Sequence, residues 1–380
     1  MPWRITKVED IRAQFVKAVT DGKQSVAALC RAHGISRKTG YKWLRRSNTG
    51  KGLTDLSRAP SHVANKTDTA VEAAVVALRN RHPAWGPKKL TKRLSSSFEM
   101  PSVKTVGRIL SRNGLIDPAE SLKHKAFRRF ERSVCNDLWQ ADFKGDFSLG
   151  NGQRCYPFDI LDDHSRFALF LEARPNVQNV KECFLSAFRA YGLPKQVLTD
   201  NGWCFRGIHN GYTALERWFM DHDVHPIHGR PYHPQTQGKV ERFHLSMKLE
   251  ALRGKRFADL EEADAALGTW RDCYNRERPH EALNGLTPAE VYKPSPREYT
   301  ESVKPFDYDT ATHVCKVNKW GYLRFTDFNV YLSETFIGTR LAMQESKDGA
   351  TFEVIYRNYR IAEIDPATGK LLNRVVSRLP

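Results

Sequence analysis

Three acidic residues lie far apart in the chain, each among neighbours that do not explain it. Asp142 interrupts the apolar alternation of WQADF, Asp200 closes the apolar run QVLTD, and Glu241 lies among positive charges in GKVERFH. Three carboxylates brought together would repel one another, and divalent cations would relieve that repulsion. Oxygen ligands favour Mg²⁺, with Mn²⁺ as a substitute, over zinc. Two such ions can activate an attacking hydroxyl and stabilise a leaving oxygen, so the acids predict a metal-dependent phosphoryl-transfer site.

The segments around these acids predict an α/β region with a mixed five-stranded sheet. Period-two alternation indicates three antiparallel strands, at 137–149, 154–161 and 166–173, and helices and short strands alternate afterwards. Asp200 falls where a short apolar strand ends, and Glu241 stands one turn into a helix. A sheet order that sets the first strand beside the fourth would bring the three acids together.

Each acid also has a purely structural interpretation. Asp142 could be an edge-strand residue, Asp200 the start of an Asn-Gly turn, and Glu241 part of a surface array of charges on a helix. This interpretation suits each residue taken singly, but for the three together it requires three coincidences. We therefore predict that the acids form one site.

The positive charge of the chain is concentrated in its N-terminal third. The net charge is +17, and residues 1–132 hold 28 Lys and Arg against 10 Asp and Glu, which leaves the remainder close to neutral. A single-sign excess in one region indicates a polyanionic partner, and nucleic acid is the usual one. A solvated basic surface that aids solubility is the alternative.

This basic region contains two helix-turn-helix patterns. Residues 8–46 predict three short helices, with Ser25 and Ser36 as N-caps, and residues 67–112 predict three more. Three-helix bundles without any DNA function share this periodicity, so the surrounding charge gives the pattern its weight. The predicted DNA contacts are Arg37, Lys38, Tyr41, Lys42 and Arg45 in the first unit and Lys88, Lys104, Thr105 and Arg108 in the second.

The remaining segments complete a multidomain organisation. The basic stretch KHKAFRRFER, with Arg128 and Arg129, is either a connector that follows a phosphate backbone or an exposed tether. Residues 312–365 lose helical signals and predict a small all-β barrel or sandwich, for which we favour a barrel. The predicted domains are two all-α helix-turn-helix units at 1–48 and 67–116, a basic linker at 117–134, the α/β core at 135–295 and the β-barrel at 310–368.

The chain has no apolar run long enough to cross a membrane, and its N-terminus lacks a signal-peptide pattern. Its seven cysteines are scattered singly without a CxxC pair, which argues against a disulfide framework and against a structural zinc site. We therefore expect a cytoplasmic protein without a membrane partner.

Five stretches of the sequence resemble one known family: WQADFKGDF, DDHSRF, LTDNG, HGRPYHPQTQGKVERFH and YNRERPHEALNGLTPAEVY. They are similar to the DDE transposases and retroviral integrases, which have a ribonuclease H-like core, and most of all to bacterial insertion-sequence transposases of the integrase-core group. The resemblance implies that Asp142, Asp200 and Glu241 are the catalytic triad and that Mg²⁺ is the cofactor. It also implies that the N-terminal units recognise terminal inverted repeats and that the C-terminal domain is a small DNA-binding barrel.

Two features depart from the family. The 40 residues between Asp200 and Glu241 exceed the usual spacing, which implies a lengthened loop in the region 203–212. The zinc-binding N-terminal module of retroviral integrases is absent, because Cys30 and His33 stand without a second Cys/His pair. His164 and Ser165 are expected to shape a strand turn and not to catalyse. Further expected DNA contacts on the Glu241 helix are Lys239, Arg242, His244 and Lys248.

The sequence thus predicts a bacterial, nucleoid-associated DNA transposase that hydrolyses the 3′ ends of its element and joins them to target DNA. Its partner would be double-stranded DNA, both terminal repeats and target, and bridging two ends requires a dimer or higher oligomer during reaction. A DNA-binding regulator that keeps the fold without catalysis would lack at least one acid, and none is missing. The acids alone do not exclude a ribonuclease H-like nuclease or junction resolvase. The two N-terminal helical units and the C-terminal barrel favour a protein that recognises specific DNA ends over one that recognises a DNA structure.

Overall fold

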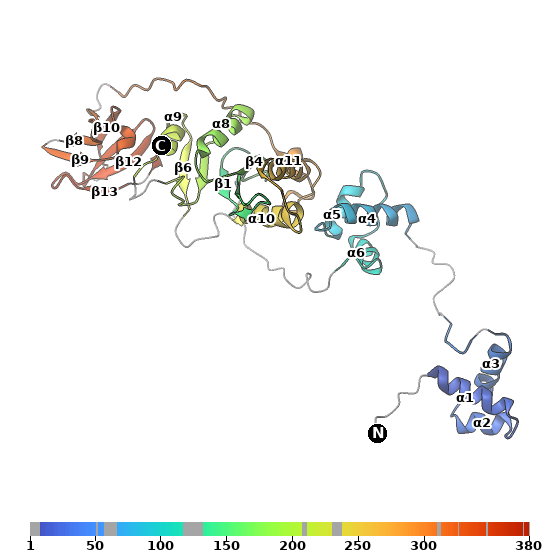
Figure 1. Cartoon of the computed structure of the whole chain (residues 1–380). Coiled ribbons are helices and arrows are strands. Elements are labelled where there is room, and N and C mark those ends of the chain that lie inside the picture. The colour runs from blue at the N-terminus through green and yellow to red at the C-terminus, as the bar shows by residue number, and fades with distance from the viewer. Residues whose placement is uncertain are drawn as a thin grey trace. The chain divides into compact units, whose positions relative to one another are not determined.

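A computed structural model describes residues 8–50, 52–56, 67–116, 132–206, 211–229, 238–309, 313–325, 327–346, 349–374 and 376–379. The chain divides into two compact units, Met1–Lys66 and Thr67–Pro380. Figure 1 shows the elements of each unit along the chain. Arg128, Arg129 and the loop that precedes Glu241 lie outside the described residues.

The first unit is a bundle of three helices, α1 (Val8–Thr20), α2 (Val26–Ala32) and α3 (Arg37–Asn48). The Ser25 and Ser36 side chains accept hydrogen bonds from the third residue along and so cap α2 and α3. Gly40 lies so close to α2 that a Cβ atom there would meet Cys30 Sγ at 2.5 Å, and the tight approach needs a glycine. The predicted helical unit is confirmed.

The second unit begins with three more helices, α4 (Thr69–Arg81), α5 (Pro87–Leu94) and α6 (Val103–Arg112). Pro87 occupies the first turn of α5, where its missing N–H costs no hydrogen bond. Trp85 and Leu90 are fully buried against the apolar face of α6. A second helix-turn-helix arrangement therefore follows from the local signals that the sequence carried.

The core is a mixed sheet in the order β4-β3-β1-β5-β6, with the short β2 also paired to β3. Strand β1 is antiparallel to β3 and parallel to β5, so it lies where the sheet changes direction. The predicted first strand, 137–149, is wrong in one respect: it is two strands, because Gly145 adopts a left-handed φ of 88° between them. The strands are β1 (Trp139–Phe143), β2 (Phe147–Ser148), β3 (Arg154–Asp162), β4 (Ala168–Arg174), β5 (Gln196–Thr199) and β6 (His225–His228).

Helices cover both faces of this sheet. One face packs on α8 (Val180–Tyr191) and α9 (Ala214–Asp221), where Phe184 and Phe188 are fully buried, each contributing about 1.5–3 kcal/mol. The other face packs on α10 (Gly238–Met247) and α11 (Leu260–Arg276). The elements that complete the core are η3 (Lys248–Leu252), η4 (Glu281–Leu283) and α12 (Pro288–Val291).

The C-terminal region is all-β with antiparallel sheets, as predicted. Its sheets have the orders β13-β12-β11-β10-β7, with β14 on β12, and β8-β9. Tyr212, from the core, donates a hydrogen bond to Ile361 O and is buried in the β core. The strands and one short helix are β7 (His313–Lys316), β8 (Tyr322–Phe325), β9 (Phe328–Tyr331), η5 (Glu334–Phe336), β10 (Arg340–Glu345), β11 (Phe352–Tyr356), β12 (Tyr359–Ile364), β13 (Leu371–Asn373) and β14 (Ser377–Arg378).

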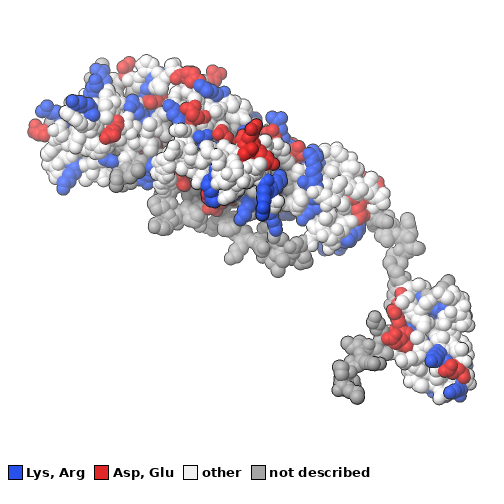
Figure 2. Space-filling view, in the orientation of Figure 1, with Lys and Arg blue, Asp and Glu red and all other residues white. Residues whose placement is uncertain are grey.

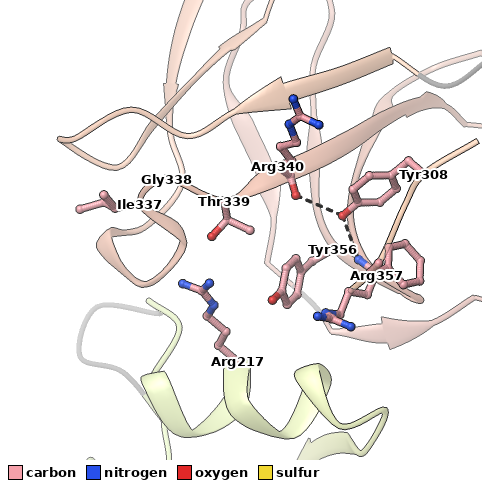
Figure 3. Close-up of a pocket in the computed structure, with 9 residues that line it drawn as sticks. Arg217, Tyr308, Ile337, Gly338, Thr339, Arg340, Tyr356 and Arg357 are labelled. Atoms are coloured by element: carbon pink, nitrogen blue, oxygen red, sulfur yellow. Dashed lines mark hydrogen bonds between the residues drawn. The ribbon is translucent and has the colours of Figure 1, made fainter. Parts of the chain in front are cut away.

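A cavity of about 410 Å³ lies between α9 and this β region (Figure 3). Arg217 reaches into it from α9 and donates a hydrogen bond to Thr335 O. Arg357 lies on the opposite wall and pairs with Asp221 at 3.2 Å. Both contacts connect α9 with the β region, so these arginines already have partners within the protein.

Candidate active site

Asp142 occupies β1 directly opposite Asp159 on β3. Burial, and then the Asp159 charge, raise the pKa of Asp142 to about 7, with Asp200 adding to the shift and His244 opposing it. One oxygen of Asp142 accepts a hydrogen bond from Phe143 N at 2.8 Å. A carboxylate in this setting lacks enough positive charge around it, which is the condition that a bound cation relieves.

Asp200 follows β5 immediately and comes close to Asp142. The parallel register pairs Gln140 with Leu198, so the ends of β1 and β5 lie side by side. Gly202 N donates to Asp200 Oδ1 at 2.8 Å and holds the carboxylate in a tight turn. The sheet order therefore brings together two of the predicted acids, which are far apart in sequence.

Glu241 lies in the first turn of α10, which packs against β1. Its side chain is exposed, and the described residues show no hydrogen bond between it and either aspartate. His244, three residues further along the same helix, points inward instead. The helix thus lies on the face of β1 that carries Asp142, but in the described residues it is His244, and not Glu241, that reaches the acids there.

The His244–Asp159 pair is a feature that the sequence reasoning missed. His244 Nε2 contacts Asp159 Oδ1 at 2.5 Å, and Asp159 is fully buried. Burial raises the pKa of Asp159 against the opposing effect of His244, while Asp159 raises the pKa of His244 despite the desolvation of the imidazole. A lone acid inside the apolar strand RCYPFDIL was the available signal. The pair connects α10 to the strand beside Asp142.

The DDHSR segment forms a second connection to α10. Asp163 is fully buried, accepts a hydrogen bond from Gln140 Nε2 at 2.6 Å and pairs with Lys239 Nζ. Ser165 donates to Asp162 at 2.6 Å and closes the turn after β3. This turn fixes the start of the helix that carries Glu241, and Ser165 acts in it as a structural residue.

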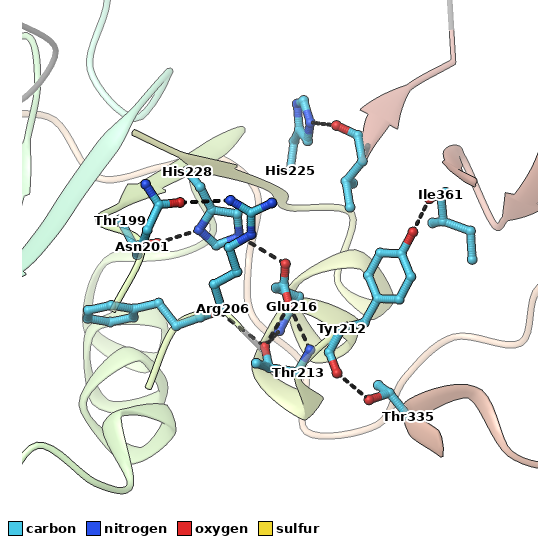
Figure 4. A network of polar contacts seen from close by, with 12 residues as sticks. Thr199, Asn201, Arg206, Tyr212, Thr213, Glu216, His225, His228, Thr335 and Ile361 are labelled. Carbon is cyan, nitrogen blue, oxygen red and sulfur yellow. Dashed lines mark hydrogen bonds and ion pairs between the residues drawn. The ribbon is translucent and has the colours of Figure 1, made fainter. Parts of the chain in front are cut away.

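A hydrogen-bond network supports the Asp200 loop (Figure 4). His228 Nδ1 contacts Thr199 Oγ1 at 3.0 Å, and its Nε2 contacts Glu216 Oε1 at 2.8 Å. Asn201 Nδ2 donates to Gly229 O at 2.7 Å. These contacts join the end of β5 to β6 and α9. His228, from the motif HGRPYHPQTQGKVERFH, and Asn201, from the motif LTDNG, therefore act as positioning residues for the Asp200 loop.

The RPH part of the YNRERPH motif holds α10 and η3 against α11. Arg278 Nε donates to Glu250 Oε1 at 3.0 Å, and its Nη2 donates to Ser246 Oγ at 3.1 Å. His280 is buried beside Arg278, and burial lowers its pKa. The motif therefore has a structural basis in a buried ion pair behind the Glu241 helix.

The predicted DNA contacts differ in their accessibility. On α3, Arg37, Lys38, Tyr41, Lys42 and Arg45 are all exposed. In the second helix-turn-helix region, Lys104 and Arg108 are exposed, Thr105 is half-buried, and Lys88 is exposed but pairs with Glu281. Arg242 on α10 and Lys248 at the start of η3 are exposed, whereas Lys239 and His244 on α10 bind buried carboxylates.

Figure 2 shows basic and acidic side chains interspersed over the visible face of the second unit. Most of this unit lies after residue 132, where positive and negative charges are nearly balanced. A membrane-crossing helix is absent from the described parts of the chain.

Two family descriptions match the chain. The Integrase core domain matches residues 134–234 and 222–288, and the Homeodomain-like domain matches residues 6–57 and 39–110. The chain therefore has a region similar to the Integrase core domain, preceded by regions similar to the Homeodomain-like domain.

Curated proteins that are similar to this chain include proteins from bacterial insertion elements. An uncharacterized 31.7 kDa protein of insertion element IS407 from Burkholderia multivorans is 27% identical over 63% of this chain and 87% of its own length. A protein described as a candidate transposase for insertion sequence element IS5376 from Geobacillus stearothermophilus is 27% identical over 93% of this chain and 88% of its own. The catalytic core domain of BIV integrase is 27% identical, covering 41% of this chain and 93% of that one, with a TM-score of 0.31. The resemblance to transposases of bacterial insertion sequences is confirmed.

Proposed function

We propose that this chain is an insertion-sequence DNA transposase that cuts the 3′ ends of its element and joins them to target DNA. The observation that supports it best is the meeting of Asp142 and Asp200 at the centre of the mixed sheet, beside the helix that carries Glu241. The named relatives from insertion elements support the same class of activity.

The donor set fits a hard divalent cation. Asp142, Asp200 and Glu241 offer only oxygen atoms, which suits Mg²⁺ or Mn²⁺. Burial and neighbouring carboxylates raise the pKa of Asp142 to about 7, so added positive charge would stabilise its ionised form. When bound, the ions would supply activation of the attacking hydroxyl and stabilisation of the leaving oxygen.

The residues of the chain hold this arrangement in place. The Asp159–His244 and Asp163–Lys239 pairs fix α10 against the strands, so we assign His244 and Lys239 a positioning role. Arg242 on this helix and Lys248 at the start of the following η3 are exposed and would contact phosphates. Hydrolysis and strand transfer exchange one oxygen for another at phosphorus, so one site serves both steps.

DNA recognition would fall to the N-terminal helices. The exposed basic face of α3 is suited to a major groove, and α6 presents Lys104 and Arg108. Terminal repeats and target are both double-stranded DNA, and holding two ends at once requires at least two copies of the chain in the reacting complex.

A strand-transfer assay tests the proposal. Full-length protein is incubated with the element's terminal DNA, Mg²⁺ and a supercoiled target, beside Glu241→Gln and the control Glu261→Gln, an exposed glutamate of α11. We expect joined products from the wild type and Glu261→Gln, and none from Glu241→Gln, which still binds the ends. Binding without joining in either Mg²⁺ or Mn²⁺ would favour the regulator, and cleavage that ignores end sequence would favour a nuclease.

A further inference from the structure

A second group of metal-ligating side chains lies where the second helix-turn-helix region meets the core. His82 caps the end of α4, while Cys273 and Glu277 lie on and just after α11. One ligand atom from each of these residues lies within 4.8 Å of the other two. The group is separate from the acids of the active site, and no step of the proposed function uses it.

The three side chains are held by packed elements. Cys273 and Glu277 are four residues apart, so they share one face of the helix end. The His82 ring stacks on the indole of Trp85, with centroids 4.0 Å apart and planes 11° apart. Cys273 also packs against the apolar cluster that contains Trp85. The packing of the end of α4 against the end of α11 therefore holds the three ligand atoms close together.

Two of these groups have unused bonding capacity. His82 Nε2 is buried and has no hydrogen-bond partner among the described residues, which is costly unless something binds it. Among the described residues, the Glu277 carboxylate has a single long ion pair, 3.9 Å from Arg81, between partly exposed side chains. An imidazole nitrogen, a sulfur and a carboxylate oxygen thus face one another with little else to bind.

We propose that His82, Cys273 and Glu277 form a site for a transition-metal ion of the Zn²⁺ type, which joins the second helix-turn-helix region to the catalytic core. Nitrogen, sulfur and oxygen ligands are those that zinc takes, and Mg²⁺ avoids the sulfur. A thiolate and a carboxylate together balance the charge of a divalent ion.

The geometry requires a small closure of the site. Bonds of 2.0–2.3 Å in a tetrahedron separate ligand atoms by about 3.3–3.8 Å, so a pair at the 4.8 Å limit would have to approach by about 1–1.5 Å. The partly exposed Glu277 can supply this by rotation of its side chain. Burial raises the pKa of Cys273 to about 11, so ion binding displaces the thiol proton.

Water would fill the fourth position. Glu250 is close enough to affect the pKa values of both His82 and Cys273. Its oxygens, however, accept hydrogen bonds from Trp270 Nε1 at 3.1 Å and Arg278 Nε at 3.0 Å. The site thus has three protein ligands and one open position.

Cobalt titration of the full-length protein, stripped of metal, tests this proposal. We expect one equivalent of Co²⁺ to produce a near-ultraviolet sulfur-to-cobalt band that one equivalent of Zn²⁺ removes and excess Mg²⁺ leaves unchanged. Because only a thiolate ligand gives this band, Co²⁺ at the three acids of the active site does not contribute to it. Cys273→Ser should lose the band, and His82→Gln should bind at least about tenfold more weakly, since each removes a ligand. Cys135→Ser, a half-buried cysteine outside the group, should retain it.

Either of two results, with the wild type or with folded Cys273→Ser, would overturn the proposal. One is a wild-type protein without the band, and the other is a band that persists in folded Cys273→Ser, which would point to Cys315 and its neighbour His313. If Cys273→Ser does not fold, as judged by circular dichroism, Glu277→Gln decides the matter. It keeps the packed residues, and unchanged Co²⁺ affinity in it would reject the site.

Discussion

Replacing Asp142 by Asn should stabilise the metal-free protein at neutral pH. The pKa of Asp142 rises from 3.8 to about 7 on folding, chiefly through burial and then through Asp159. Three pKa units correspond to about 4 kcal/mol, which is the upper limit of the gain. Because asparagine never ionises, folding of the variant does not carry the free-energy cost of burying a charged carboxylate.

The pH dependence has a definite sign. A folded-state pKa above the unfolded one contributes stability that is fully present below the unfolded pKa and lost as pH rises through the folded value. The advantage of Asp142→Asn should therefore be near zero at about pH 4 and should reach its maximum above about pH 7. Mg²⁺ should narrow the gap, because it stabilises only the wild type.

Urea unfolding of the metal-free proteins at several pH values measures this gain, with equal slopes required before midpoints are compared. Asp272→Asn, which removes an exposed aspartate of α11, is the matched control and should change little. Equal stabilities of Asp142→Asn and wild type at about pH 8, or an advantage that does not shrink towards acid, would refute the reasoning.

Three other substitutions test the site and its supports. Gly202→Ala sets a Cβ atom 2.9 Å from Asp200 Oδ1, so strand transfer should fall roughly 10- to 100-fold while end binding and circular dichroism stay unchanged; full activity would contradict the turn's role. Arg278→Ala leaves Glu250 buried without its ion-pair partner, and urea unfolding should show a loss of about 3–5 kcal/mol, whereas less than about 1 kcal/mol would contradict the buried pair. Arg45→Ala should reduce the slope of log K against log salt for terminal DNA by about 1, and an unchanged slope would remove this residue from the DNA interface.

The helical regions could be predicted because their signals are local. Ser25, Ser36 and Ser102 cap helices with hydrogen bonds to residues three positions further on, and Pro87 starts α5. The strand at 137–149 was predicted wrongly in one respect, because the alternation of side chains runs through Gly145, where the left-handed backbone separates β1 from β2. Alternation along one segment reports which face of a strand is buried, and it does not report where pairing stops.

The surroundings of the predicted acids were harder to foresee. Asp159 has no sequence feature that links it to His244, and Lys239 looks like a solvent-facing base until Asp163 is placed beside it. A buried charge is tolerated only where a partner meets it, and that partner is chosen by the packing of α10 on the sheet.

By itself the sequence determined the residue types and their local conformations: three acids at strand and helix ends, capped basic helices and an all-β C-terminal region. Only the tertiary structure decided which groups meet, such as Asp142 with Asp159, or His82 with Cys273. The lack of a CxxC pair excludes only zinc sites whose ligands lie close together in the chain, whereas these ligands come from the ends of α4 and α11. Periodicity and capping act over a few residues, but a contact across a sheet or an interface depends on strand order and helix packing, which the whole chain sets at once.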